Sequence, residues 1–209
     1  MSLLNQKRTS IYQQPVQIDK SIAVIPFVNM SNDPAQEYFS DGMTEEVLNR
    51  LFKIGDLKVT SRTSSMKFKG AKLTAKEIAS QLGVVNILEG SVQKSGNRIK
   101  ITVQLIDANT DTHLWSETYE REFKDVFAIQ SEIAQGVAKG LSATLSASAK
   151  SSFSAIPTKN IEAYNLYLKG MFEIQKVTPG SMEIGLKMMN QAIALDPDFA
   201  LPYLGIAYY

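Results

Sequence analysis

The sequence predicts an α+β fold: an α/β sandwich with a mixed sheet of about five strands, followed by an all-α helical-repeat segment. Strict apolar alternation, which is the period of a strand, is clearest over residues 99–105. Apolar stripes spaced by three and four residues, which is the period of a helix, lie between the strand patterns. From residue 160 onward only the helical period remains. The expected order of the first part is β-α-β-α-β-β-β-α.

The first half of the chain predicts strands that alternate with helices. Residues 21–27 form a short β-branched run, which is typical of a buried strand. An amphipathic helix follows, and Ser40 or Asp41 is its expected N-cap. A second strand is expected over residues 57–61, where apolar and polar residues alternate again.

The middle of the chain predicts three consecutive strands and a long helix. Thr74 and Glu77 have the spacing of a capping box, which opens the second helix. A strand is then expected over 84–93, with a hairpin turn at 95–97. Two further strands lead into an amphipathic helix over 125–145.

The changes in pattern divide the chain into four expected segments. A polar N-terminus without an apolar core is expected to be a flexible leader. A stretch rich in Ser, Ala and Lys that ends in proline is typical of a linker or of a frayed helix end. The expected segments are the leader at 1–19, the α/β domain at 20–145, the linker at 146–159 and the helical segment at 160–209.

The composition is that of an ordinary folded protein. The chain has 209 residues, of which 44% are hydrophobic and 21% are charged, and its formal net charge is +1. This charge gives no overall attraction to nucleic acid or anionic lipid, so we expect no nucleic-acid contact. The absence of cysteine excludes disulfides and thiolate sites, and it suits a cytoplasmic or a periplasmic location equally. Every apolar run falls short of the roughly 20 residues of a membrane span.

The segment GLKMMNQAIALDP resembles the second helix of a tetratricopeptide repeat. The resemblance rests on small and bulky residues at helix contacts and on a closing Asp-Pro pair, namely Gly185, Met189, Ala192, Asp196 and Pro197. The tail that follows resembles the first helix of a next repeat, although the first repeat exceeds the usual length of about 34 residues. The resemblance implies a protein or peptide partner. The expected contact residues, through which a homodimer could also form, are Tyr203, Ile206 and Tyr208.

The upstream part, over roughly 20–145, resembles the TolB-like N-terminal domain. The segments that carry the resemblance are SIAVIPFVNMSNDPAQEYFSDGMTEEVLNRL, VTSRTSS, IASQLGVVNILEGSV, RIKITVQLIDANTDTHLWSETYER and FAIQSEIAQGVA. In bacteria this domain precedes tetratricopeptide arrays in large regulatory chains, often after an adenylate/guanylate cyclase domain or a DNA-binding domain. The resemblance therefore implies a non-catalytic sensory and protein-interaction module of a signalling protein.

A basic stretch offers the strongest chemical signal in the sequence. Such a stretch could bind phosphate, aided by backbone N–H groups at the start of the helix near Thr74. A basic stretch of this kind, here over residues 62–76, is more often a solvated loop and helix face, and both interpretations stay open. The alternative function is therefore a small-ligand or phosphate sensor. Its candidate residues are Arg62, Lys67, Lys69 and Lys72.

Other polar residues give weaker signals. Asp33, Glu37 and Asp41 could ligate a hard cation, but their spacing matches no calcium loop, and a turn with a helix cap is favoured. His113 is the only histidine, and we expect it to be packed or to lie at a sheet edge. The sequence has no P-loop, dinucleotide fingerprint or serine-hydrolase elbow. We therefore expect no catalytic residue, no metal and no cofactor in this chain.

Three aromatic residues near His113 allow two interpretations. They could form a binding surface for a ligand, or they could pack in the core or between domains. Packing is the favoured interpretation. The residues are Trp115, Tyr119 and Phe123.

Overall fold

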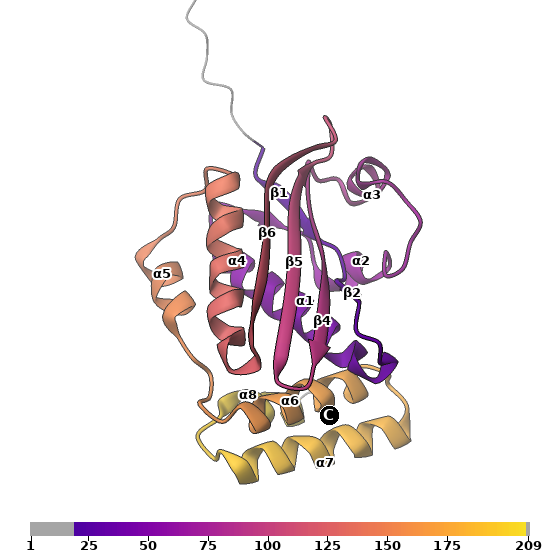
Figure 1. Cartoon of the computed structure of the whole chain (residues 1–209), viewed down its shortest axis with the longest axis vertical. Coiled ribbons are helices and arrows are strands. Elements are labelled where there is room, and N and C mark those ends of the chain that lie inside the picture. Colours follow the sequence, from indigo (N-terminus) through magenta and orange to yellow (C-terminus); the bar gives the residue numbers. More distant parts are fainter. Residues whose placement is uncertain (1–18, 208–209) are drawn as a thin grey trace, which may run out of the picture.

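A mixed β-sheet lies at the centre of the computed structural model, which describes residues 19–207 (Figure 1). Its strands are β1 Ser21–Val24, β2 Val28–Asn29, β3 Lys58–Val59, β4 Asn86–Ser95, β5 Arg98–Asp107 and β6 Thr112–Glu122. The strand order is β3-β1-β4-β5-β6, and β2 pairs with β4 beside β1. The pairs of β1 with β3 and with β4 are parallel, whereas β4, β5 and β6 form an antiparallel meander. The predicted α+β class is confirmed.

Helices lie on both faces of the sheet and close one of its ends. They are α1 Glu37–Phe52, α2 Arg62–Met66, α3 Ala75–Leu82, α4 Val126–Gly140, α5 Ala147–Ser154, α6 Ile161–Ile174, α7 Pro179–Leu195 and α8 Ala200–Ala207, with 3-10 turns at Pro34–Gln36 and Phe123–Asp125. The helices α1 and α4 lie against one face, while α6, α7 and α8 lie below the turn between β4 and β5 (Figure 1). Ile78 and Ala79 of α3 pack in a second, smaller core on the face opposite α1 and α4. No helix within residues 19–207 is long and apolar enough to cross a membrane.

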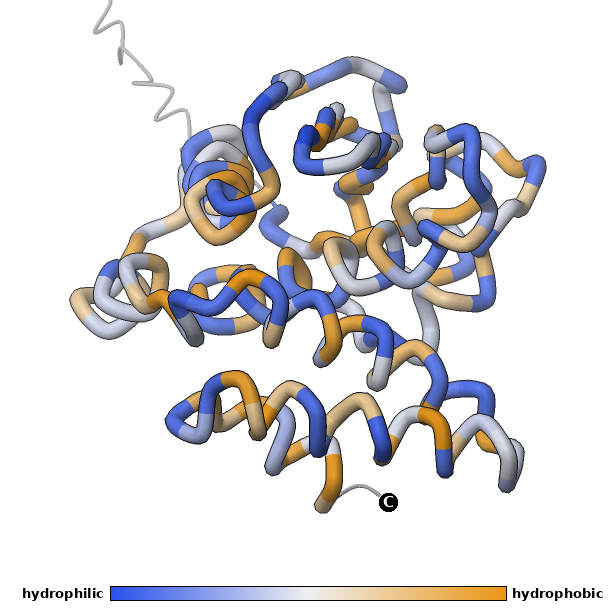
Figure 2. Tube along the Cα trace, turned by 60° about the horizontal axis from the view of Figure 1, so that its bottom comes forward, coloured by the Kyte–Doolittle hydropathy of each residue, from blue (hydrophilic) through white to orange (hydrophobic). Residues whose placement is uncertain are grey.

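The main hydrophobic core continues from the sheet into the C-terminal helices. The alternating residues of β5 face this core, and all are buried: Ile99, Ile101, Val103 and Leu105. Tyr164 of α6 and Phe199, just before α8, are fully buried in the same core. Figure 2 shows hydrophobic and hydrophilic residues alternating along the C-terminal helices, as expected when one side of each helix is buried. The sheet and the C-terminal helices therefore share one core.

Helix α1 holds this arrangement together because it touches both parts. Gly42 lets α6 approach closely, since a Cβ atom placed there would lie 2.8 Å from Leu168 Cδ2. On the sheet side, Thr44 Oγ1 accepts a hydrogen bond from Phe27 N at 2.9 Å. The residue before Phe27 is Pro26, which has no N–H group to donate to a neighbouring strand. The single strand predicted over 21–27 is therefore interrupted there, and β1 and β2 are separate strands.

Two helix boundaries differ from the prediction. Helix α1 begins at Glu37, so Ser40 and Asp41 lie inside it; the chain enters through a 3-10 turn that Asp33 caps instead. Helix α4 ends at Gly140 rather than near 145. It stops because Ser142 takes the left-handed conformation (φ 48°) and the N–H of Ala143 bonds back to the Ala138 carbonyl at 2.7 Å.

The segment predicted as a linker, 146–159, contains helix α5. Ser146 caps this helix by accepting a hydrogen bond from Ala149 N. Phe153 is only 5% exposed and belongs to the main core. Only two side chains of α5 are buried, so the segment has low hydrophobicity and its sequence shows no apolar stripe that would predict a helix.

Candidate functional site on helix α1

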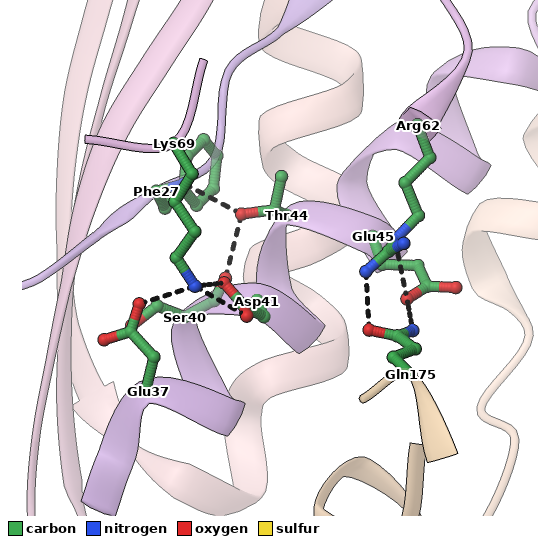
Figure 3. Close-up of polar contacts among 9 residues, drawn as sticks. All are labelled: Phe27, Glu37, Ser40, Asp41, Thr44, Glu45, Arg62, Lys69 and Gln175. Atoms are coloured by element: carbon green, nitrogen blue, oxygen red, sulfur yellow. Dashed lines mark hydrogen bonds and ion pairs between the residues drawn. The ribbon is translucent and has the colours of Figure 1, made fainter. Parts of the chain in front are cut away.

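Three carboxylates spaced by four residues lie along one side of α1 and bind the basic segment that follows β3 (Figure 3). We call Glu37, Asp41 and Glu45 the acidic row. The ammonium of Lys69 lies 2.7 Å from Glu37 Oε1 and 2.6 Å from Asp41 Oδ1. Burial alone would lower the pKa of Lys69, but its hydrogen bonds to Asp41 and Glu37 outweigh burial and raise that pKa. Lys69 therefore stays charged and fastens its loop to α1.

The third carboxylate of the acidic row joins three segments of the chain. Glu45 Oε2 lies 3.3 Å from Arg62 Nε, at the first residue of α2. Gln175, just after α6, accepts from Arg62 Nη2 at 2.5 Å and donates to Glu45 Oε2 at 3.0 Å. Figure 3 shows Arg62, Glu45 and Gln175 in this closed arrangement. It connects the α/β part to the C-terminal helices on the surface of the molecule.

The four basic candidate residues do not converge on one point. Arg62 and Lys69 turn toward different carboxylates of α1. Lys67 and Lys72 are exposed, and neither forms an ion pair within the described residues. The predicted capping box at Thr74 is confirmed: Thr74 Oγ1 accepts from Glu77 N at 3.2 Å, and Glu77 Oε2 accepts from Thr74 N at 2.8 Å. The start of α3 is thus capped by its own side chains.

The carboxylates considered for a cation serve other purposes. Asp33 Oδ1 accepts from Ala35 N at 2.8 Å, which fits the favoured turn and cap. Glu37 and Asp41 hold Lys69, as described above. Within residues 19–207, no group of three or more His, Cys, Asp or Glu side chains is placed to hold a metal ion.

A second polar cluster lies inside the core, on another side of α1. We call Arg50, Gln130, Ser131, Tyr164 and the Phe153 carbonyl the Arg50 cluster. Arg50 donates to Gln130 Oε1 at 3.3 Å and to Ser131 Oγ at 3.1 Å, and its Nη1 lies 3.4 Å from Phe153 O. Gln130 Nε2 then donates to Tyr164 Oη at 2.9 Å. The cluster therefore links α1, α4, α5 and α6.

Sequence reasoning missed the Arg50 cluster, although one signal was present. Arg50 lies three residues after Val47, on the apolar stripe that predicts which side of α1 is buried. A charged residue on such a stripe needs buried polar partners. Its partners, however, come from residues 80 or more positions later in the chain, and no local pattern identifies them.

The aromatic residues near the end of the meander pack as predicted. Trp115 lies over Gly136 of α4, where a Cβ atom would come within 2.4 Å of its ring. Tyr119 and Phe123 are buried in the main core. His113 is exposed on β6, which is the edge strand of the meander. The favoured interpretations of these residues are confirmed.

The predicted contact residues of the C-terminal end have different environments. Tyr203 is exposed, and its hydroxyl donates to Pro197 O at 3.1 Å. Ile206 is partly buried against the main core, whereas its neighbour Leu204 is exposed. Tyr208 lies outside the described residues.

Comparisons with known proteins place this architecture in a family. Residues 18–136 match the family described as "HilA/YgeH-like transcriptional regulator, second domain". A curated relative from Rhizobium meliloti (strain 1021), named "Putative adenylate cyclase 3", is 36% identical over 187 residues. The aligned part covers 90% of this chain and 32% of the relative, so the chain spans about a third of that protein.

Solved structures give more distant likenesses. The lipoprotein GNA1162 from Neisseria meningitidis has a TM-score of 0.41 and 21% identity, over 49% of this chain and 80% of that one. TolB from Acinetobacter baumannii has a TM-score of 0.43 and 16% identity, over 58% of this chain and 28% of that one. The family match covers more than half of the sequence, and the chain belongs to the family of the second domain of HilA/YgeH-like transcriptional regulators.

Proposed function

We propose that the chain is a non-catalytic regulatory and protein-interaction module of a longer bacterial signalling protein. One observation carries this proposal: the same domain is related both to a transcriptional regulator and to a protein named for an adenylate cyclase. Gene regulation and cyclisation of a nucleotide have no chemistry in common. A domain related to both proteins therefore supplies a regulatory role that the two share, and neither DNA binding nor nucleotide cyclisation. The match covers 32% of the cyclase-named relative, which leaves most of that protein for other parts.

We also propose that residues 160–209 contain one tetratricopeptide repeat and the first helix of the next, after the α/β domain at 20–145 and its connection at 146–159. The close contact of α6 with α7 supports this, since a Cβ atom on Gly185 would lie 2.8 Å from Gly170 O. Gly205 of α8 approaches Met189 of α7 in the same way. Tyr203 and Ile206 would then contact a protein partner or a second copy of the chain.

The phosphate-sensor alternative draws less support from the geometry. Arg62 and Lys69 already contact carboxylates, so an incoming phosphate would have to displace those carboxylates. The exposed Lys67 and Lys72 remain available. A thermal-shift titration with ATP and inorganic phosphate separates the two functions: the interaction module predicts no rise in Tm, whereas a saturable rise supports the sensor.

A domain exchange with the longer cyclase-named relative tests the proposed function. The corresponding region of that relative is deleted, or is replaced by this chain, and conversion of ATP to cyclic AMP is measured. We expect the isolated chain to form no cyclic AMP. We expect the deletion variant still to form cyclic AMP, but at a rate that differs severalfold from that of the unaltered relative. We expect the replacement to bring this rate back toward the value of the unaltered relative. Cyclic AMP formed by the isolated chain, or a deletion without any effect on the rate, would contradict the proposal.

A further inference from the structure

A hollow of about 330 Å³ opens on the surface where α1, α5, α6 and α8 meet. We call it the Arg50 hollow, because Arg50 forms part of its wall. The volume lies within the range of small-molecule binding sites, which starts at about 300 Å³. Other residues of its wall that matter here are Glu46, Phe52, Lys53, Ala155 and Leu201.

The guanidinium of Arg50 is buried, and no carboxylate of residues 19–207 forms an ion pair with it, although Glu46 attracts it from one turn away. Arg50 is 5% exposed, and its hydrogen bonds go only to the uncharged groups of Ser131, Gln130 and Phe153. Its Nε has no hydrogen-bond partner among the described residues. A buried cation with only neutral partners is costly, because the lost hydration is not replaced by an opposite charge. An anion entering the Arg50 hollow would supply that charge.

Glu46, one turn before Arg50, does not neutralise it fully. Burial raises the pKa of the Glu46 carboxyl to about 7; the charge of Arg50 acts against this shift, and the neighbouring Glu45 adds to it. A Glu46 carboxyl with a raised pKa takes up a proton more readily than an ordinary glutamate, and in its protonated form it can donate a hydrogen bond. The residues that α5 and α8 contribute to the wall are uncharged. The charged and titratable groups around Glu46 are Glu45, Arg50 and Lys53 of α1, and Tyr164 and Tyr167 of α6.

The remaining wall of the Arg50 hollow is suited to an apolar body. Phe52, the last residue of α1, is 72% exposed, so its phenyl ring offers apolar surface to a ligand in the hollow. Leu201 of α8 and Ala155 after α5 add apolar surface to the wall. Lys53, next to Phe52, supplies a second positive charge at the edge.

We propose that the Arg50 hollow binds a small organic carboxylate with an apolar or aromatic body. The carboxylate pairs with Arg50 and Lys53, and the body lies against Phe52 and Leu201. Because a bound carboxylate repels ionised Glu46, binding takes up a proton at Glu46, which then donates a hydrogen bond to the ligand. This site goes beyond the proposed regulatory function and does not depend on it.

Titration of the whole chain with phenylacetate, followed by NMR and calorimetry at pH 6 and pH 8, tests the site. We expect saturable binding at pH 6 and affinity lower by about tenfold at pH 8, because Glu46 loses its proton between these values. Uncharged phenylacetamide and inorganic phosphate are expected to bind at least tenfold more weakly than phenylacetate. Absence of saturable binding at pH 6, or equal binding of phenylacetamide, would overturn the proposal. Tighter binding of phosphate would overturn the ligand class.

Four variants separate the site from the stability of the fold. Glu46→Gln keeps a hydrogen-bond donor that does not titrate. The affinity of this variant for phenylacetate at pH 8 should therefore lie within about twofold of its affinity at pH 6. Lys53→Gln and Phe52→Ser change exposed side chains and should each weaken binding severalfold. Lys100→Gln, on the exposed side of β5, should bind normally. Unchanged affinity in both Lys53→Gln and Phe52→Ser, or a tenfold pH effect retained in Glu46→Gln, would refute the assignment. The titration measures no cyclase output, so this proposal and the regulatory one fail separately.

Discussion

Helix α1 uses two polar clusters of different character to attach the rest of the chain. The acidic row, Glu37, Asp41 and Glu45, lies on the surface and pairs with side chains that are partly exposed. The Arg50 cluster lies in the core and contains one cation with neutral hydrogen-bond partners. Both clusters reach the C-terminal helices, through Gln175 in the first case and Tyr164 in the second.

The difference shows that charge pairs and buried hydrogen bonds have separate roles in this fold. Ion pairs near the surface are screened by water and salt, so they can exchange partners at small cost. A buried cation can lose its partners only at a large cost, because no water replaces them. The acidic row is therefore the adjustable connection between the two parts of the chain, and the Arg50 cluster is the fixed one.

Arg50→Ala should give the largest loss of stability. It leaves Gln130 Oε1 without a donor and opens a cavity beside the core, and together these effects cost about 3 kcal/mol in the free energy of unfolding. Urea unfolding measures the change. Arg98→Ala is the matched control, because the Arg98 side chain is 65% exposed and should contribute less than about 0.5 kcal/mol. Equal effects of the two substitutions would remove the distinction between the clusters.

Glu46→Gln should stabilise the chain at high pH. The pKa of Glu46 rises from 4.5 to about 7 on folding, so between these values the folded chain keeps a proton that the unfolded chain releases. The free energy of unfolding therefore falls as the pH rises through this window and levels off above it. We expect the variant to be more stable than the unaltered chain by about 3 kcal/mol at pH 8, and equally stable at pH 4. A stability difference that does not change with pH in urea unfolding would contradict this.

Lys69→Met should cost less, and its effect should depend on salt. The Lys69 side chain is 35% exposed, and its loss leaves Glu37 and Asp41 without a counter-charge, so we expect about 1 kcal/mol at low salt. The effect should fall by about half in roughly 0.5 M NaCl, because the charges are screened. Lys67→Met, at an exposed position without an ion pair among the described residues, serves as the control. An effect of Lys69→Met that is independent of salt would argue against an adjustable surface connection.

The smallest expected effect is the coupling between Arg62 and Gln175. A double-mutant cycle with Arg62→Met and Gln175→Leu should give a coupling of about 0.5 kcal/mol, because both side chains meet at Glu45. Thermal and urea unfolding of the four proteins measure it. Strictly additive changes in the free energy of unfolding would mean that Arg62 and Gln175 are not coupled through Glu45, and that the acidic row does not connect α2 to α6.

The sequence predicts the fold class and the element order, but it does not predict the contacts that unite the parts. The alternation over β5 and the Thr74 capping box depend on residues close in the chain, so both are recognised correctly. Helix α5 escapes prediction because only Ala149 and Phe153 are buried in it. Local reasoning therefore leaves a linker and a frayed helix end as alternatives, and tertiary packing of these two side chains accounts for the helix.

The candidate site was only partly predictable for the same reason. Arg62 and Lys69 stand out as basic residues, but their partners lie on a helix whose position relative to them depends on the whole sheet. The role of Glu45 needs Gln175, which is 130 positions away. Arg50 gave a local signal, a charge on an apolar stripe, and that signal identifies a buried cluster without identifying its members.

Native-state hydrogen exchange tests most directly the claim that α1 unites the sheet and the C-terminal helices. Amides of α6 and of β5 should exchange with the same free energy of opening and the same dependence on urea, because both pack in one core through α1. Arg50→Ala should lower both free energies together. If α6 instead opens at a much lower free energy than β5, the helices are a separate unit, and the account of α1 as their fixed connection is wrong.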